Sequence, residues 1–291
     1  MMCPDYVMPS TVEEALATLA SLRGEGRLIA GGTDLVIQWQ RGERTVRTLV
    51  DITAIRGLDE IRLDSSYLVV GAAATWTQIE RSPLIRQRAA VLAAAAGQVG
   101  SPQIRNVGTI AGNVVNAQPA ADGSIALLAL DAEAEIANLT GRQWVPLAGL
   151  FVSPGVSRVD ATSEMITSFR FRPQAPRESS AYERRARRRA LALPILNVAV
   201  RVLLTANGKS FRDARIAIGP VAPVPFRSIK AEEALRNQPI NDETIADAIE
   251  AAVGESKPRS SLLRASKEYR RELIAVLVRR ALLRAIQAAQ G

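Results

Sequence analysis

The stretch Leu28-Ile-Ala-Gly-Gly-Thr-Asp-Leu35 decides the fold of the N-terminal part of this chain. Residues 27–30 read as a short buried strand, and Leu35-Val-Ile-Gln-Trp39 has the apolar character of a packed helix. A strand that passes through paired glycines into a helix lets successive backbone N–H groups point at one anion. The pattern therefore predicts an anion cradle, although an ordinary tight turn that caps a helix has the same residues about as often.

A second segment of this kind is Thr109-Ile-Ala-Gly-Asn-Val-Val-Asn-Ala-Gln-Pro-Ala-Ala-Asp122. It lies in 100–122, where interleaved glycine, asparagine and proline predict a long irregular segment. The alternative is a structural loop whose asparagines bond their own backbone. Two such loops could grip the phosphates of a dinucleotide from opposite sides, with Asp122 accepting from a ribose hydroxyl. Neither segment fits G-x-G-x-x-G, so the dinucleotide binder that they predict is not a Rossmann fold.

The remaining pattern predicts two parts that meet where Pro-Gln-Ala-Pro occupies 173–176. In the first part, Ser10 and Glu13 predict a capping box at a helix start, and Thr75 with Gln78 predicts another. Elements expected there are strands at 46–52, 67–72 and 165–172, a strand pair around 140–141, one alanine-rich helix over 83–99 and a helix over 124–130. Elements expected in the second part are strands at 182–187, 195–205 and 211–219, and helices at 229–236, 242–253 and 267–289.

Composition excludes several kinds of chemistry. The 291 residues contain no histidine, and the single cysteine, Cys3, cannot form a disulfide or a metal centre within the chain. These absences exclude a Ser-His-Asp or Cys-His site, an imidazole base and histidine or cysteine metal centres, so any redox chemistry must belong to a bound organic cofactor. In line with this, we expect no catalytic residue and no metal ligand in the chain. The net charge of +8 includes an arginine run at 184–189, which favours a solvated face or an acidic partner over nucleic acid. No apolar run is long enough to span a membrane and no signal peptide is visible, so a cytoplasmic protein is expected.

Several stretches together resemble one family, the FAD-binding medium subunits of molybdenum hydroxylases such as xanthine and carbon monoxide dehydrogenases. The N-terminal stretches that carry the resemblance are 30–35, 103–113 and 116–122. The C-terminal stretches that carry it are 187–191, 194–200, 216–223 and 266–273. The resemblance implies an α+β protein: a two-part α/β FAD-binding domain of the non-Rossmann, PCMH type over 1–174, split near 55, followed over 177–291 by a small antiparallel three-stranded sheet with helices.

The resemblance also implies which residues bind FAD. The first turn would surround the diphosphate through Leu28, Ile29, Ala30, Gly31, Gly32, Thr33, Asp34 and Leu35. The second loop would contribute Gly108, Thr109, Gly112, Asn113, Val115, Asn116 and Asp122. Val99 and Gly100 would lie near the flavin, Ile166 near the adenine and Arg184 close to the isoalloxazine. Two positions depart from the family pattern, since Ala111 replaces a glycine and Ala192 replaces a common acidic residue.

In this family the medium subunit passes electrons rather than activating the substrate. The resemblance implies a large partner with the molybdenum–molybdopterin cofactor, a small partner with two [2Fe–2S] clusters, and a dimer of heterotrimers. NAD or another acceptor would oxidise the flavin. The substrate could be xanthine or another purine, another N-heterocycle or an aldehyde, and residues 151–155 and 164–167 favour the purine type. The alternative is a stand-alone FAD oxidoreductase, whose base would be a carboxylate or tyrosine such as Tyr182, and a further alternative is a basic DNA-binding module.

Overall fold

A parallel sheet carries the first glycine turn. The computed structural model describes residues 4–188, 190–261 and 265–291. The N-terminal elements are β1 (Asp5–Val7), α1 (Val12–Ser21), β2 (Gly26–Ile29), α2 (Leu35–Gln40) and β3 (Thr48–Asp51), with the strands in the order β1-β3-β2. Thr11, and not Ser10 as the sequence predicted, caps α1, because the Thr11 hydroxyl accepts from the Glu14 N–H. The Ser10 N–H instead donates to the Glu14 carboxylate.

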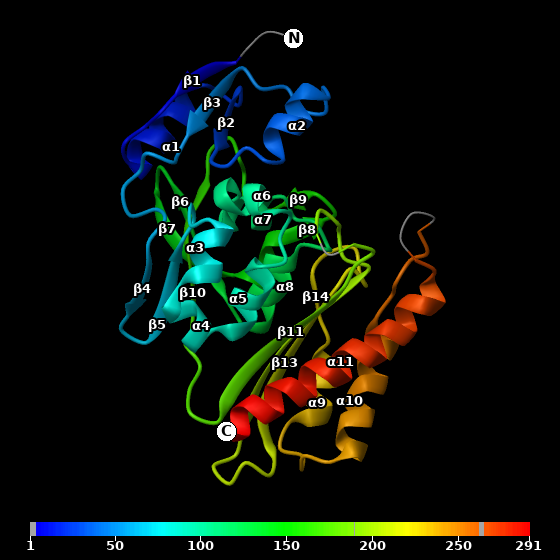
Figure 1. Cartoon of the computed structure of the whole chain (residues 1–291). Helices are drawn as coiled ribbons and strands as arrows, with labels where there is room; N and C mark the ends of the chain where they lie inside the picture. Colours follow the sequence, from blue (N-terminus) through cyan, green and yellow to red (C-terminus); the bar gives the residue numbers. More distant parts are fainter. Residues whose placement is uncertain (1–3, 189, 262–264) are drawn as a thin grey trace.

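An antiparallel sheet forms the middle of the molecule (Figure 1). Its strands are β4 (Ile61–Asp64), β5 (Tyr67–Gly71), β10 (Met165–Phe171), β6 (Glu133–Asn138) and β7 (Gly141–Pro146), in that order across the sheet. Its helices are α3 (Trp76–Arg81), α4 (Pro83–Arg88), α5 (Ala90–Ala96), α6 (Pro102–Val107), α7 (Ile110–Val115) and α8 (Asp122–Ala129). A short 3-10 turn over Leu147–Leu150 leads into the hairpin β8 (Phe151–Ser153) and β9 (Val156–Ser157).

Two predictions for this part were wrong. The alanine-rich segment is not one helix but α4 and α5, because Ala89 leaves the helical region at φ −156° and ψ 56°. The Val91 N–H that this break frees bonds to Ser180 Oγ of the C-terminal sheet, so tertiary packing overrides helix propensity. The segment 100–122 is not irregular throughout, since it contains α6 and α7, capped by Ser101 and Thr109.

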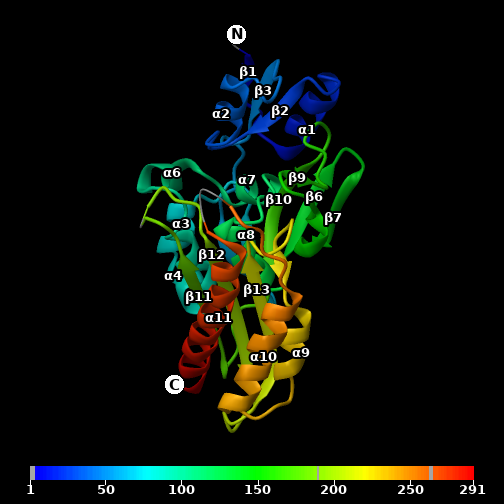
Figure 2. The same cartoon turned by 90° about the vertical axis from the view of Figure 1, so that its right-hand side faces the viewer.

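The C-terminal sheet is antiparallel in the order β11 (Glu178–Arg185), β12 (Leu196–Leu204), β13 (Phe211–Gly219) and β14 (Phe226–Arg227). The first three strands are those expected, and the two-residue β14 adds a fourth that the sequence did not predict. The helices α9 (Ile229–Leu235), α10 (Asp242–Glu255) and α11 (Lys267–Gln290) complete this part. Figure 2 shows the three sheets following one another along the molecule, with the first sheet and α9–α11 at opposite ends.

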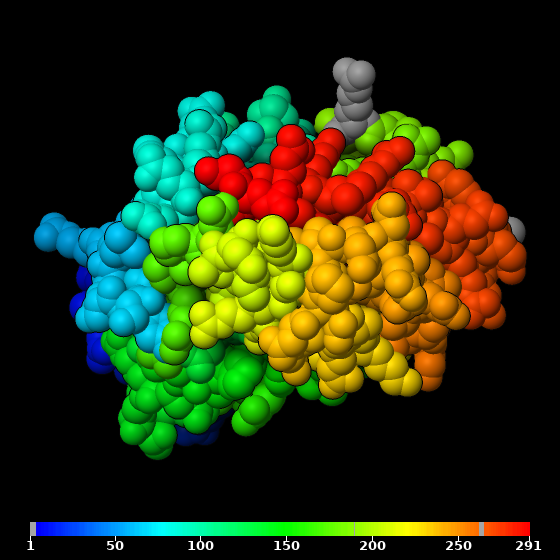
Figure 3. All heavy atoms as spheres, turned by 90° about the horizontal axis from the view of Figure 1, so that it is seen from below, coloured from blue at the N-terminus to red at the C-terminus, as the bar shows by residue number. Residues whose placement is uncertain are grey.

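The C-terminal sheet is covered on both faces. Helices α5 and α8 pack on it from the middle part, while α11 packs along β11 and β12 from the other side. Figure 3 shows α11, in red, lying along the surface beside α10. Buried side chains of α11 such as Ile274, Leu277 and Val278 join the core of this sheet. This apolar stripe confirms the amphipathic helix predicted over 267–289.

Candidate functional site

The two glycine turns of the sequence lie directly against each other. A Cβ added at Gly31 would lie 2.0 Å from the Val107 carbonyl oxygen and 2.9 Å from the Gly108 nitrogen. The backbone of the first turn therefore touches the backbone that joins α6 to α7. Gly32 has a φ of +64°, a conformation that favours glycine, and so turns the chain from β2 toward α2. Residues far apart in the sequence thus form one wall with two adjoining turns.

Side-chain caps and a bridge to α3 hold the second turn. The Thr109 hydroxyl accepts from the Gly112 N–H at 3.2 Å, which satisfies one free donor at the start of α7. The Trp76 N–H donates to the Gly108 carbonyl at 3.1 Å. Trp76 follows Thr75, whose predicted capping box with Gln78 is confirmed. The turn before α7 is therefore held both by the Thr109 cap and by a backbone hydrogen bond from α3, and its position does not depend on the short helix alone.

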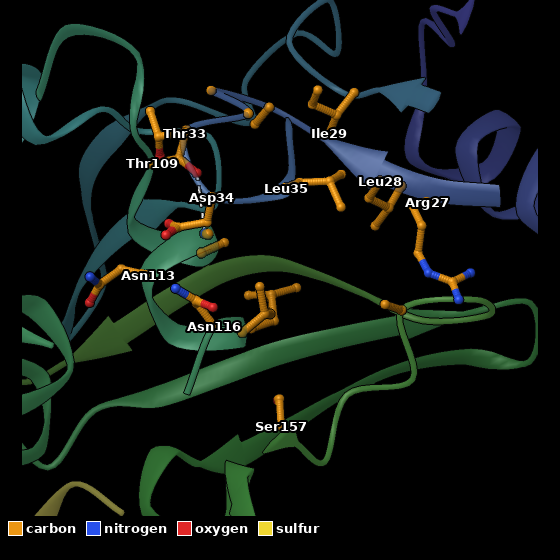
Figure 4. Close-up of a pocket in the computed structure, with 18 of the residues that line it drawn as sticks. Arg27, Leu28, Ile29, Thr33, Asp34, Leu35, Thr109, Asn113, Asn116 and Ser157 are labelled. Atoms are coloured by element: carbon orange, nitrogen blue, oxygen red, sulfur yellow. Dashed lines mark hydrogen bonds between the residues drawn. The ribbon is translucent and has the colours of Figure 1, made fainter. Parts of the chain in front are cut away.

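A cavity of about 550 Å³ opens between these turns, β9 and β10. Figure 4 shows Thr33 and Asp34 on the first turn, Asn113 on α7 and Asn116 just after it, with Ser157 on the opposite side. The predicted site residues that line it are Leu28, Ile29, Ala30, Gly31, Gly32, Thr33, Asp34, Leu35, Val99, Gly108, Thr109, Gly112, Asn113, Val115, Asn116 and Ile166. Gly100, Asp122 and Arg184 are not among its lining residues.

The charges around the cavity are mixed. Arg27 and Arg44 line it, and both can attract an anion. Partial burial raises the pKa of the Asp34 carboxyl, while a hydrogen bond from Asn116 opposes that shift. This hydrogen bond also joins the first turn to α7. Across the cavity, hydrogen bonds from Thr162 and Ser163 hold the pKa of Asp160 below its usual value, and nearby Arg27 adds to the effect.

Sequence reasoning missed most of one side of the cavity, where it assigned only Ile166 to the cofactor. The lining residues that it did not assign to FAD binding are Arg27, Gln38, Arg44, Ile52, Trp76, Ile104, Ala111, Gly155, Val156, Ser157, Val159, Asp160, Ala161, Thr162, Glu164 and Met165. Many of them belong to 155–165, which contains β9 and runs to the start of β10. The run Asp160-Ala-Thr-Ser163 is a local signal for this side, because Asp160 accepts hydrogen bonds from Thr162 and Ser163 as an Asx turn does.

Ala111, the departure from the family's glycine, fits without strain. It lies in the first turn of α7, is 9% exposed and is not among the residues with positive φ. Its N–H donates to the Ala72 carbonyl at 3.2 Å, so its backbone is held by the segment that directly follows β5. An alanine is compatible with this helical position because only a positive φ demands glycine there.

The three predicted residues outside the cavity form a neighbouring group. Asp122 is 7% exposed and accepts from Arg184 Nε at 3.1 Å. Arg184 lines a second hollow together with Gln98, Ile195 and Tyr269. Gly100, with a φ of +50°, accepts at its carbonyl from the Leu191 N–H at 3.1 Å. Ala192, the second departure, contributes its backbone carbonyl, which accepts from the Arg184 guanidinium.

Metal and membrane features were searched over the described ranges. No group of three histidine, cysteine or acidic residues within them is placed to hold a metal ion. None of the helices described there has the length and apolar character needed to cross a membrane.

Fold and site together define a class of α+β protein in which two adjoining glycine turns, and not a Rossmann motif, border one cavity. The chain belongs to the family described as the FAD binding domain in molybdopterin dehydrogenase, which matches residues 2–173. Residues 180–285 match the CO dehydrogenase flavoprotein C-terminal domain. The family resemblance predicted from the sequence is confirmed, and the chain is an oxidoreductase-type subunit of this family.

Individual relatives cover most or nearly all of the chain. A xanthine dehydrogenase FAD-binding subunit of Escherichia coli O157:H7 is 35% identical over 289 residues, covering 98% of this chain and 97% of the relative. A nicotinate dehydrogenase FAD-subunit of Eubacterium barkeri is 34% identical over 83% of this chain and 82% of its own length. The solved carbon monoxide dehydrogenase of Hydrogenophaga pseudoflava superposes with a TM-score of 0.92 at 29% identity, covering 100% of both chains.

Proposed function

We propose that this chain binds FAD in the cavity between the two glycine turns and transfers electrons as the medium subunit of a molybdenum hydroxylase. The observation that carries this proposal is the contact between Gly31 and the Val107–Gly108 backbone, which brings two glycine-bearing helix starts to one cavity. The cavity's donors fit a diphosphate, since both turns present backbone N–H groups and Arg27 and Arg44 supply positive charge. Bound flavin would accept electrons and pass them on.

Individual residues take distinct roles in this proposal. Ala30–Leu35 would hold the diphosphate from one side, and Thr109, Gly112 and Asn113 from the other. Ile166, buried at 3% exposure in β10, would give the adenine an apolar wall, and Val99 would lie toward the flavin. We further propose that 1–174, split near 55, and 177–291 are the two domains.

Electrons would come from outside the chain. We propose a small partner with two [2Fe–2S] clusters, a large partner with the molybdenum cofactor, and assembly as a dimer of heterotrimers in the cytoplasm. The names of the carbon monoxide dehydrogenase medium chains among the relatives support a multi-subunit complex. NAD or another acceptor would oxidise the flavin. The xanthine and nicotinate dehydrogenase relatives support a purine or another N-heterocycle as substrate of the complex.

A charge placed in the cavity tests the FAD site. Val115 ends α7, is 38% exposed and lines the cavity, so Val115→Asp should not disturb the core. The added carboxylate would repel the diphosphate by about 1–2 kcal/mol, since two charges about 8 Å apart interact this strongly near a protein surface. We expect FAD affinity to fall by about tenfold, measured by titration of flavin fluorescence.

The matched control is Val152→Asp, which changes the same side chain at a position that is 62% exposed in β8 and does not line the cavity. Its FAD affinity should equal that of the wild type. Equal affinities of the two variants would contradict the cavity as the FAD site. Turnover of a small substrate by this chain with FAD alone would favour a stand-alone oxidoreductase instead.

The helix caps provide a second test. Thr109→Ala removes the cap of α7 and should lower the free energy of unfolding by about 1 kcal/mol. It should also weaken FAD binding several-fold, because the start of α7 faces the cavity. Thr11→Ala removes an equivalent cap from α1, away from the cavity, where Thr11 accepts from the Glu14 N–H at 3.1 Å. Thermal unfolding should show similar losses of stability for both variants, while FAD titration should show weaker binding only for Thr109→Ala. Equal losses of FAD affinity would contradict the proposal that the start of α7 contacts FAD.

A further inference from the structure

Asp122 is a buried carboxylate that is not among the residues lining the cavity. Its oxygen accepts from Arg184 Nε and Asn197 Nδ2, both at 3.1 Å, and from the Tyr182 hydroxyl. The Asp122 and Arg184 side chains are 9% and 8% exposed. Burial raises the pKa of the Asp122 carboxyl, while the charge of Arg184 and the hydrogen bonds from Tyr182 and Asn197 oppose that shift. The carboxylate and the buried arginine thus serve as counter-charges to each other. Asp122 therefore fixes where the Arg184 side chain lies.

The same helix turn is also fixed against the cavity. The Ser124 N–H donates to Asn113 Oδ1 at 3.2 Å, and Asn113 lines the cavity. A Cβ added at Gly123 would lie 2.1 Å from the Trp76 ring, so the first turn of α8 packs tightly on another lining residue. Asp122 thus sits on a rigid turn whose position relative to the cavity is set by two independent contacts.

Arg184 in turn holds a segment of backbone beyond the cavity. Its guanidinium donates to the Ala192 carbonyl, and the adjacent Leu191 N–H donates to the Gly100 carbonyl at 3.1 Å. Gly100 directly follows Val99, which lines the cavity. Val99 in turn follows Gln98, which lines the second hollow together with Arg184. The Leu191–Ala192 backbone is therefore held at the junction of the two hollows by Arg184 and Gly100.

We propose that Asp122 is a positioning residue that orients Arg184 and, through it, holds the Leu191–Ala192 backbone against Gly100. That this junction is the flavin end of the cavity rests on the proposed function; the positioning role itself does not. Without the carboxylate, Arg184 would be a buried charge without a counter-charge, which is strongly unfavourable. Its side chain would move toward water and release the Ala192 carbonyl.

Limited trypsin digestion of the full chain tests this role, because Arg185, Arg187 and Arg188 directly precede the held backbone. The rate of cleavage after these arginines, followed by mass spectrometry well below the unfolding temperature, should rise about tenfold in Asp122→Asn and in Arg184→Gln. The double variant should be cleaved no faster than the faster single variant, since both changes break one link. Asp122→Glu, which keeps the charge, should restore most of the protection.

Glu232→Gln is the matched control, because Glu232 is another buried carboxylate paired with an arginine, Arg227, at 2.6 Å. It should leave the cleavage rate unchanged. An equal rise in this control, additive effects in the double variant or no rise in Asp122→Asn would each overturn the proposal. FAD titration of the wild type separates the two ideas: a chain that takes up no FAD contradicts the proposed function, while the cleavage rates still decide the role of Asp122.

Discussion

Gly31→Ala is expected to abolish FAD binding and to destabilise the N-terminal part of the chain. The added methyl would lie 2.0 Å from the Val107 carbonyl oxygen, 2.5 Å from its carbon and 2.9 Å from the Gly108 nitrogen. All three atoms belong to the backbone, so no side-chain rotation relieves the clash, and the two turns must separate. Overpacking of this kind costs about 1–3 kcal/mol and more where backbone must move. We expect about 3 kcal/mol and a loss of FAD affinity of at least about 100-fold.

Thermal unfolding and flavin fluorescence titration measure the two effects. Gly254→Ala in α10 is the matched control, because a Cβ there meets no heavy atom within 4 Å. Alanine in a helix is favoured over glycine by about 1 kcal/mol, so the control should be slightly more stable and bind FAD as the wild type does. A Gly31→Ala chain whose FAD affinity stays within about threefold of the wild type would rule out contact between the turns as the basis of the site.

The first glycine turn could be predicted because its signal is local. An apolar strand, two glycines and an apolar helix lie within a dozen residues, and the structure has β2, the turn and α2 in that order. The Thr75–Gln78 capping box was predictable for the same reason, since both of its hydrogen bonds join residues three apart. Such features rest on contacts between residues that are close in the sequence, so they can be predicted without knowing the rest of the fold.

Helices α6 and α7 could not be predicted, because their stability is not local. Each has six residues, too few for a stable isolated helix, and their glycine and asparagine content predicts a loop. Their stability comes from the Ser101 and Thr109 caps and from packing against the first turn and Trp76. The break between α4 and α5 has a similar origin, since Ser180 of β11 supplies the partner for the first turn of α5.

The pairing of Asp122 with Arg184 lies beyond sequence reasoning for another reason. The resemblance assigned both residues to the cofactor, one at a ribose hydroxyl and one near the isoalloxazine. The structure joins their side chains to each other across 62 positions of sequence. Only the packing of α8 on the C-terminal sheet, against β12 and β13, makes this contact, and no spacing in the sequence encodes it. The lining residues within 155–165 were missed for the same reason, because only the fold of the β8–β9 hairpin brings them to the cavity.

Glu232→Ala is expected to unfold the C-terminal part at a much lower temperature. Glu232 is 1% exposed and accepts from the Ile216 N–H at 3.0 Å, from Arg227 Nε at 2.8 Å and from Arg227 Nη2 at 2.6 Å. It therefore ties α9 to β13 and β14 and supplies the counter-charge for Arg227. Removing one member of a buried ion pair costs about 3–5 kcal/mol, because the remaining charge loses its partner.

The neighbouring residue supplies the control for this change. Glu233 lies in the same turn of α9 but is exposed, so Glu233→Ala should shift the unfolding midpoint little. Arg227 also contacts Asp131, which lies just after α8 and bonds Arg215 as well, so part of its charge stays compensated. The loss should therefore fall toward the lower end of that range, and Glu232→Ala combined with Asp131→Asn should lose more than the two single variants together. Equal unfolding midpoints for Glu232→Ala and Glu233→Ala would show that the buried pair contributes nothing to the docking of α9 on the sheet.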